Sequence, residues 1–248
     1  MKKTTTKPNP VFYADQLELA LGAEHPRVDG ITHERDSVDL LTWNVFASLD
    51  TDTDREYLAG VMRPLCGNDL RAPVRLSLWT GRDRAPKLEP SRAYVRHLEQ
   101  TTEGTIDRQT VTQPIEVPVR IEASNVLGFA EVTQGALPGG TAGRDRLIEL
   151  LDAGIVHAHR LGKALSVAVV YRHGTPEASE LSARINQLRR PDELRAAMPW
   201  VTTFPDIRLR ELSLQQLAQT WERERKHLRL HGQPAKAFSA HIRQLGLR

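Results

Sequence analysis

The sequence predicts an α/β fold with a mixed central sheet flanked by helices, and three observations support this. Two apolar runs, Ile115 to Ser124 and Val126 to Thr133, meet at the short turn Ser124-Asn125 and indicate an antiparallel hairpin. A helical pattern follows over Arg144 to Leu161. The continuous apolar run Ala164 to Tyr171 is typical of a strand covered on both faces. Hairpin, helix and buried strand in this order indicate a two-sided sheet.

The composition is that of an ordinary globular protein, with 248 residues of which 40% are hydrophobic and 26% charged. The single cysteine, Cys66, excludes a disulfide scaffold and a cysteine-rich zinc module, and favours a reducing compartment. The longest apolar stretch is only strand-sized, so no membrane span is expected. The basic N-terminus lacks an uninterrupted apolar core and does not resemble a signal peptide. We therefore expect a cytoplasmic protein with no membrane partner.

Helices are expected in the first third of the chain. After a lead-in over residues 1–10, an apolar periodic segment covers Phe12 to Leu21. Apolar residues at helical spacing predict a buried helix over Asp36 to Leu49, with Asp36 or Ser37 as its N-cap. A second helix is expected over Asp54 to Leu65, closed by the turn Cys66-Gly67-Asn68.

The remaining elements follow in order. Val74 to Trp79 alternates with period two and predicts a strand, and a helix is expected from about Pro90 to Gln100. Pro118 places the first hairpin strand at a sheet edge, or places its start near that residue. Leu137 to Gly143 is expected to be a loop, and Leu212 to Leu230 a long charged helix outside the core.

The positive charge is concentrated at the C-terminus. Residues 205–248 contain nine Lys or Arg and four acids, whereas the whole chain has a formal net charge of only +3. Such a tail can form a surface for an anionic partner, nucleic acid first, although a solvated basic helix face is the commoner explanation. The candidate nucleic-acid-binding residues are Arg223, Arg225, Lys226 and Arg229. We expect three segments: a lead-in and helix over 1–30, an α/β core over 31–204 and a basic helical extension over 205–248.

Two acids in the hairpin are candidate site residues. Glu122 and Glu131 lie in otherwise apolar runs, and a carboxylate in a core strand must be paired or hold a cation. The alternative is that both lie on a solvated face. The chain lacks the G-x-S-x-G, H-E-x-x-H and G-x-x-x-x-G-K-[ST] motifs. His157 and His159, two residues apart on a helix, point to different faces and are expected to be exposed or capping residues.

The string SVDLLTWNVFASL, from Ser37 to Leu49, resembles the opening helix of a group of bacterial restriction-endonuclease-like proteins of the PD-(D/E)XK nuclease superfamily. The strand LSLWTG, from Leu76 to Gly81, and the hairpin from Glu116 to Gly135 continue the resemblance, which covers about residues 34 to 172. It implies a restriction-endonuclease-like sheet in which strand acids hold Mg²⁺ and a lysine orients the attacking water. An acid of the first helix often completes the metal site. Glu34, Asp36 and Asp39 are the candidates.

The resemblance assigns the site residues in two registers. In the first, Glu131 is the metal-binding acid of the hairpin, while Val119 and Thr133 replace the motif's aspartate and lysine. The second uses Asp107 as the aspartate and Glu122-Ala123-Ser124 in place of the E-x-K segment. Neither register contains the lysine, so Lys163 or Arg120 would have to supply the cation. The full candidate set is Glu131, Glu116, Glu122, Asp39 and Lys163 for catalysis, and Glu131 with Asp107 for the metal.

Three functional hypotheses follow. The first is a catalytically degenerate nuclease-like protein, needing no cofactor, that binds nucleic acid (DNA rather than RNA) or a partner protein in a bacterial restriction or phage-defence system. The second is an active Mg²⁺-dependent DNA endonuclease with relocated catalytic groups. The third is a scaffold subunit whose Trp200, Trp221 and C-terminal helix dock another protein. The resemblance also implies a homodimer, because many such nucleases cut both strands as dimers.

Overall fold

The computed structural model describes residues 8–22, 24–50, 55–81, 85–101, 108–137 and 144–247. The chain forms two compact units: a larger one over Asp54–Ser213, and a smaller one that combines Met1–Thr53 with Leu214–Arg248. The boundaries of these units differ from those of the three expected segments at two places. The residues before Asp54 group with the C-terminal helices instead of the α/β core, and residues 207–213 belong to the sheet.

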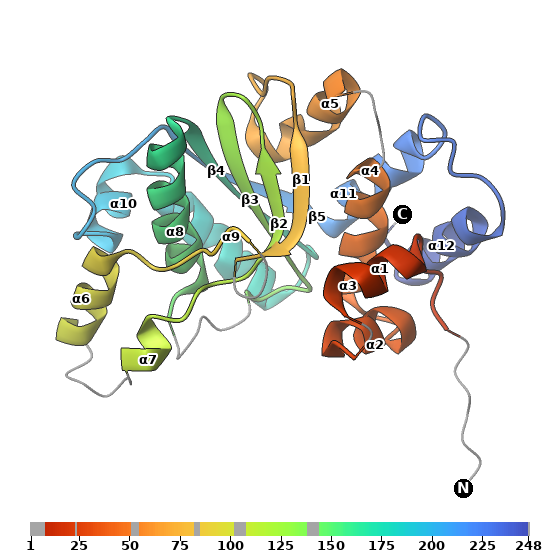
Figure 1. Ribbon diagram of the computed structural model, residues 1–248, viewed down its shortest axis with the longest axis horizontal. Helices are drawn as coiled ribbons and strands as arrows, with labels where there is room; N and C mark the ends of the chain where they lie inside the picture. The colour runs from red at the N-terminus through yellow and green to blue at the C-terminus, as the bar shows by residue number, and fades with distance from the viewer. Residues whose placement is uncertain are drawn as a thin grey trace, which may run out of the picture. The chain divides into compact units, whose positions relative to one another are not determined.

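The larger unit is built on a five-stranded sheet in the order β1-β2-β3-β4-β5 (Figure 1). Strands β1, β2 and β3 form an antiparallel meander, and β4 and β5 add to it in parallel. The α/β class and the mixed sheet are thus confirmed. The strands span Arg75–Thr80, Val117–Glu122, Val126–Thr133, Ala164–Tyr171 and Ile207–Ser213.

β3 and β4 have the bounds that their sequence patterns predict, whereas β2 is shorter than the expected run from Ile115 to Ser124. β2 and β3 pair around the turn at Ser124-Asn125, and all eight residues of β3 are buried. The expectation that Pro118 marks an edge is wrong, because β2 lies between β1 and β3. The alternative is confirmed: β2 begins at Val117, beside the proline, so the ladder loses little from the missing N–H.

Helices cover both faces of this sheet. A Cβ added to Gly128 of β3 would lie 2.7 Å from Sγ of Cys66, at the end of helix α5 (Arg55–Cys66). A Cβ added to Gly154 of helix α8 (Arg146–Leu161) would meet Leu165 and Phe129. Since Gly128 and Phe129 are successive strand residues, they face opposite sides, and α5 and α8 therefore lie on opposite faces. Figure 1 shows α8 and α5 on the two sides of the strands.

The α8 face carries the main core of the larger unit. Apolar residues of α8 and α9 pack there against odd-numbered residues of the parallel strands, such as Val167 and Val169. Because β3, β4 and β5 are adjacent and parallel, crossovers of the usual right-handed type place α8 and α9 on the same face of the sheet. The remaining helices of this unit are α6 (Arg92–Thr101), α7 (Arg108–Val111), α9 (Pro176–Leu188) and α10 (Pro191–Ala197).

The smaller unit is helical. The expected helix over Asp36 to Leu49 is present as three consecutive pieces, and Ser37 is its N-cap, with Oγ accepting a hydrogen bond from the Leu40 N–H at 3.3 Å. A π-helical turn interrupts it at Trp43–Ala47. The helices of this unit are α1 (Ala14–Leu21), α2 (Pro26–His33), α3 (Val38–Thr42), η1 (Trp43–Ala47), α4 (Ser48–Asp50), α11 (Leu214–Glu224) and α12 (Gln233–Gln244).

An aromatic core joins the two ends of the chain within this unit. The ring centroid of Phe12 lies 5.9 Å from that of Trp221 and 5.8 Å from that of Phe238. Trp43 Nε1 donates a hydrogen bond to the Phe12 carbonyl at 2.5 Å, and the buried side chain of Asn44 accepts one from the Phe12 N–H at 2.9 Å. These contacts explain why residues before Asp54 group with α11 and α12.

The C-terminal region differs from the expected long helix. Ile207–Ser213 is a strand, α11 ends at Glu224, and α12 follows after a connecting segment. The charged residues of β5 obscure the strand pattern in the sequence. In the structure their charges have partners, since Arg208 pairs with Asp69 and Asp206, and Arg210 Nε donates to the Pro64 carbonyl at 2.8 Å. Among the described helices, none is long and apolar enough to cross a membrane.

Candidate functional site

Glu131, the principal candidate acid, lies near the carboxyl end of β3 and is 3% exposed. Its Oε2 accepts hydrogen bonds from Arg146 Nη2 at 2.6 Å and from Arg146 Nε at 3.0 Å. Nη2 of Arg146 also donates to the carbonyl of Glu116, at the start of the hairpin. The Arg146 guanidinium therefore neutralises Glu131, the acid that the resemblance assigns to the metal site.

Two further charged residues extend this pair into a buried group of four, the carboxyl-end cluster (Glu131, Arg144, Arg146 and Glu149). Arg144 Nε lies 2.5 Å from Glu149 Oε1, and Arg146 Nη1 lies 3.6 Å from Glu149 Oε2. Sequence reasoning missed Arg144, Arg146 and Glu149. A signal was available: two arginines flank Asp145, the N-cap of α8, although cations are unfavourable at a helix N-terminus and so need carboxylate partners.

The other motif positions do not complete a metal site. Val119 pairs with Ala130, so its side chain lies on the face opposite to Glu131, and an acid at that position would not reach the same ion. Thr133, at the position of the motif lysine, donates its hydroxyl to the carbonyl of Ala136. In the part of the chain that the structure describes, no group of three His, Cys, Asp or Glu side chains is placed to hold a metal ion. These residues do not fit the Mg²⁺ site that the resemblance implies.

Glu122 and Lys163 lie at the other end of the sheet. Glu122 pairs with Leu127, and Lys163 precedes Ala164, which pairs with Val126. The five residue steps from Val126 to Glu131 extend roughly 16 Å along the strand. The structure therefore does not bring Lys163 to Glu131.

The acid and the lysine satisfy one another instead. Lys163 Nζ donates to Glu122 Oε1 at 3.1 Å, and Arg120 Nη2 lies 2.7 Å from Glu122 Oε2. Burial raises the pKa of Glu122, but hydrogen bonding to Lys163 and the charge of Arg120 outweigh it and hold the pKa below its ordinary value. Lys163 and Arg120 therefore both serve as ion-pair partners of Glu122 at a half-buried strand end.

The remaining candidate acids are Glu116, Asp39 and Asp107. The backbone carbonyl of Glu116 accepts a hydrogen bond from Arg146 Nη2. Asp39 belongs to the smaller unit, where its Oδ1 accepts a hydrogen bond from Arg27 Nη1 at 2.9 Å. Asp107 lies outside the described residues.

Of the two histidines of α8, His159 is exposed as expected and His157 is not. His157 is 6% exposed, so the expectation is wrong for this residue, because nearly the whole helix is covered by neighbouring elements. Burial lowers the pKa of His157. His159 is exposed, and its Nε2 lies 2.9 Å from the Thr203 carbonyl. Among the described residues, neither histidine belongs to a group of three His, Cys, Asp or Glu side chains that could hold a metal ion.

A second polar cluster lies two strands away on the same face. Glu131 pairs with Val169, and Val169 with Glu211 of β5. Glu211 accepts hydrogen bonds from Tyr171 Oη at 2.6 Å, Ser182 Oγ at 2.9 Å and Arg189 Nη1 at 3.1 Å. Burial raises the pKa of Glu211, but these hydrogen bonds and the Arg189 charge outweigh it and hold the pKa below its ordinary value. The cluster fastens α9 to the end of the sheet.

No family model, curated protein or solved structure matches this chain. In the carboxyl-end cluster each carboxylate already has a guanidinium partner, and a divalent ion would have to displace Arg146 from Glu131. The cluster can orient the start of α8 against the end of β3.

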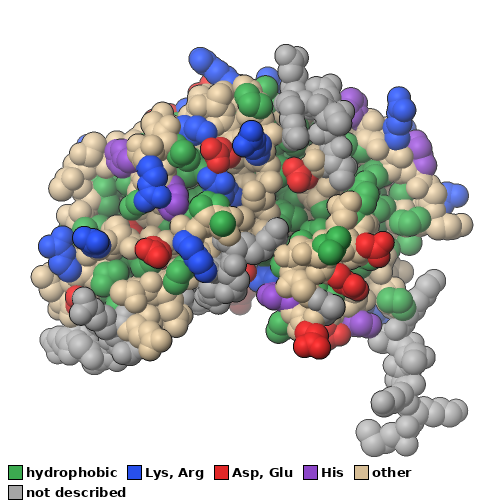
Figure 2. Space-filling view, in the orientation of Figure 1, with side chains coloured by type: hydrophobic (Ala, Val, Ile, Leu, Met, Phe, Trp, Pro, Cys, Tyr) green, Lys and Arg blue, Asp and Glu red, His purple; other side chains and the backbone are tan. Residues whose placement is uncertain are grey.

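The cationic residues form a surface in the smaller unit. From Arg225 to Leu247 the chain contains no Asp or Glu. Arg223, Lys226 and Arg229 are exposed, and Arg225 is half-buried. Arg223 pairs with Glu224, and Arg225 Nε lies 3.3 Å from Glu222 Oε2, so two of the four candidates share their charge with acids of α11. Figure 2 shows Lys, Arg and His side chains over the segment between α11 and α12, and acids over α1 and α2.

Proposed function

We propose that this protein is a nuclease-like nucleic-acid-binding protein that does not cleave its ligand. In this proposal the sheet of the larger unit and the helix from Ser37 to Leu49 of the smaller unit derive from a PD-(D/E)XK-type nuclease without catalysis, and the acid-free segment from Arg225 to Leu247 holds the phosphate backbone. A single observation carries the loss of catalysis: both nitrogens of Arg146 that face Glu131 donate to its carboxylate. The antiparallel meander, crossover helix and parallel strand support the fold assignment.

The electrostatic part of the proposal rests on Lys226 and Arg229. Both are exposed and lie in the connection between α11 and α12, where the sequence has no acids. Phosphate contacts of this kind need no aromatic stacking and give binding that weakens steeply with salt. The aromatic side chains Trp221 and Phe238 of the same unit are buried in its core, which leaves the scaffold hypothesis without an exposed tryptophan there.

Fluorescence anisotropy with a labelled DNA duplex tests the binding. The affinity is expected to fall linearly with salt on logarithmic axes between about 50 and 200 mM, and Lys226→Glu with Arg229→Glu is expected to lower it at least tenfold. The matched control is Arg92→Glu with Arg96→Glu on the exposed face of α6, which preserves the net charge change. Equal losses in both double variants, or salt-independent binding, would contradict the proposal.

Incubation of the duplex with Mg²⁺ or Mn²⁺ tests the loss of catalysis. No cleavage product is expected with either ion. Metal-dependent cleavage that disappears in Glu131→Gln would show that the site works as a nuclease despite Arg146, and the active-endonuclease hypothesis would then replace this one.

A further inference from the structure

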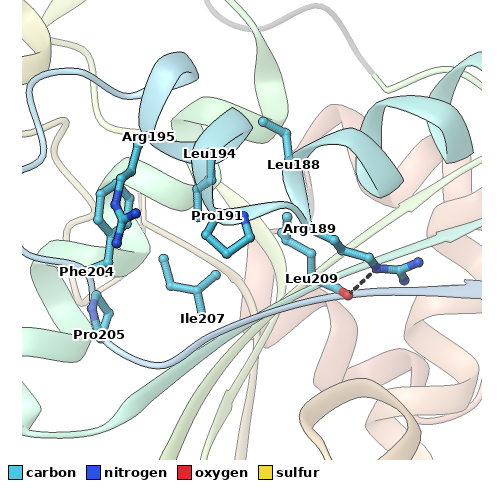
Figure 3. A pocket seen from close by; sticks show the side chains of 9 residues that line it. All are labelled: Leu188, Arg189, Pro191, Leu194, Arg195, Phe204, Pro205, Ile207 and Leu209. Atoms are coloured by element: carbon cyan, nitrogen blue, oxygen red, sulfur yellow. Dashed lines mark hydrogen bonds between the residues drawn. The ribbon is translucent and has the colours of Figure 1, made fainter.

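The edge of the sheet in the larger unit carries an apolar pocket that the proposed function does not use. Its volume is about 220 Å³, larger than the roughly 150 Å³ cavity that holds a benzene molecule. The lining comes from the end of α9, from α10, from β5 and from the segment before it. These residues are Leu188, Arg189, Pro191, Leu194, Arg195, Phe204, Pro205, Ile207 and Leu209 (Figure 3). The pocket accommodates one large apolar side chain.

The lining is asymmetric in charge. It contains two guanidinium groups and no carboxylate. Arg189 is held in place, since its Nε donates to the Leu209 carbonyl at 3.0 Å and Nη1 to Glu211 at 3.1 Å. Arg195 is 68% exposed and lies 3.6 Å from Asp192, which is 99% exposed, so this weak pair yields readily to another carboxylate. The charge favours an occupant that brings an acid next to its apolar group.

The adjacent strand β5 is an edge strand, with β4 as its one neighbour among the described strands. The Leu165 N–H donates to the Asp206 carbonyl at 2.8 Å, so the even-numbered residues of β5 direct their backbone groups toward β4. The odd-numbered residues Ile207 and Leu209 direct theirs outward. The bond from Arg189 reaches the Leu209 carbonyl on this outer side. An extended chain added to this edge would place alternate side chains over the pocket.

We propose that β5 and this pocket form a docking site for an extended segment of a partner protein that carries a large apolar residue with an acidic residue beside it. The segment adds to β5 as a sixth strand and hydrogen-bonds the outward backbone groups of Ile207. Its apolar side chain enters between Leu194 and Phe204, and its carboxylate pairs with Arg195. The charges at Arg208, Arg210 and Glu211 disfavour pairing of β5 with a second copy of itself, which makes a different chain the occupant.

Selection from a phage-displayed library of random ten-residue peptides on the full-length chain tests this site. Enriched peptides are expected to combine a large apolar residue with Asp or Glu. Their affinity should fall at least tenfold in Ile207→Pro, which removes an outward N–H without touching the ladder to β4, and in Arg195→Glu. Ile207→Val retains the N–H, and Arg92→Glu changes an exposed arginine of α6; both are expected to bind normally.

Amide hydrogen exchange of the wild-type chain gives a readout that does not depend on the folding of Ile207→Pro. Bound peptide is expected to slow exchange at Ile207 while leaving the amides of β1 unchanged. Failure of the library to enrich any such peptide would overturn the proposal, and so would unchanged exchange at Ile207 with bound peptide. Displacement of the peptides by hexanoate at equal concentration would also overturn it, because the pocket would then be a site for small organic acids.

Discussion

Arg146 makes two hydrogen bonds to one carboxylate oxygen of Glu131, from Nη2 at 2.6 Å and from Nε at 3.0 Å. The Arg146 side chain is 11% exposed and that of Glu131 is 4% exposed, so each charge is stabilised by the other instead of by water. The contact ties the first turn of α8 to the end of β3. A position that the nuclease resemblance assigns to a metal ligand thereby becomes part of the internal framework of the larger unit.

The first prediction concerns this pair. Arg146→Met leaves a buried carboxylate without its partner and is expected to lower the free energy of unfolding by about 3–5 kcal/mol. Adding Glu131→Leu removes the uncompensated charge, so the double variant should be more stable than Arg146→Met alone. Urea denaturation of the four proteins gives the coupling energy. As a control, the exposed pair Arg190 and Glu193 should show coupling below about 1 kcal/mol. Additive effects at Glu131 and Arg146 would contradict the interpretation.

A second prediction concerns the packing of α5 on β3. In Gly128→Ala the added methyl group would lie 2.7 Å from Cys66 Sγ and 3.2 Å from Cβ of Ile121, so overpacking is expected to cost about 1–3 kcal/mol. Cys66→Ala removes the sulfur atom and leaves space at the same position. The double variant is therefore expected to be more stable than Gly128→Ala. Thermal unfolding measures the difference, and a double variant no better than Gly128→Ala would show that the backbone, not the sulfur, sets the limit.

The sequence patterns predicted the elements with strong, simple periodicity. The hairpin and β4 are mostly apolar, and Ser37 has the side chain that an N-cap requires. β5 was missed because Arg208 and Arg210 belong to it, and their charge favoured a basic extension. In the fold these arginines alternate with Ile207 and Leu209. Arg208 pairs with Asp69, which follows α5, and Arg210 donates to the Pro64 carbonyl in α5.

The candidate site shows a different limit. Sequence reasoning identified Glu131, but the residue that determines its chemistry, Arg146, lies 15 positions away on the next helix. The sequence offers Lys163 as a cation for Glu131 and Glu122 as the acid of an alternative register, because it does not reveal at which end of the sheet each residue lies. Strand register decided it: pairing of Val126 with Ala164 joins Lys163 to Glu122 and separates both from Glu131.

A third prediction concerns Asp152, which is 2% exposed and joins three elements. It accepts hydrogen bonds from the Ser91 N–H at 2.6 Å, from Ser91 Oγ at 2.8 Å and from Trp200 Nε1 at 2.9 Å. Asp152→Ala leaves these donors without an acceptor and is expected to cost about 3 kcal/mol, whereas Trp200→Phe loses one bond and should cost about 1 kcal/mol. Denaturant unfolding measures both. A smaller loss in Asp152→Ala than in Trp200→Phe would contradict the role of Asp152 as the shared acceptor.

The fourth prediction is a pH dependence of the smaller unit through His241 of α12. This side chain is 8% exposed and stacks against Phe238 with ring centroids 6.3 Å apart. Burial lowers the pKa of His241; the nearby Asp36 acts in the opposite direction and Arg35 in the same direction. The unfolded chain, with an ordinary histidine pKa near 6.5, therefore binds a proton more readily than the folded chain. Stability from this residue is fully present above about pH 6.5 and is lost as pH falls toward the folded pKa.

His241→Phe removes this titration while retaining a ring at the packed position. Wild-type protein is therefore expected to lose more unfolding free energy between pH 7 and pH 5 than the variant does, measured by urea denaturation at each pH. His157 in the larger unit has its pKa lowered by burial as well, so the variant should retain part of the dependence, and His157→Phe should remove a separate part. Parallel pH profiles for wild type and His241→Phe would mean that protonation of His241 is tolerated in the fold, because Asp36 compensates for its burial.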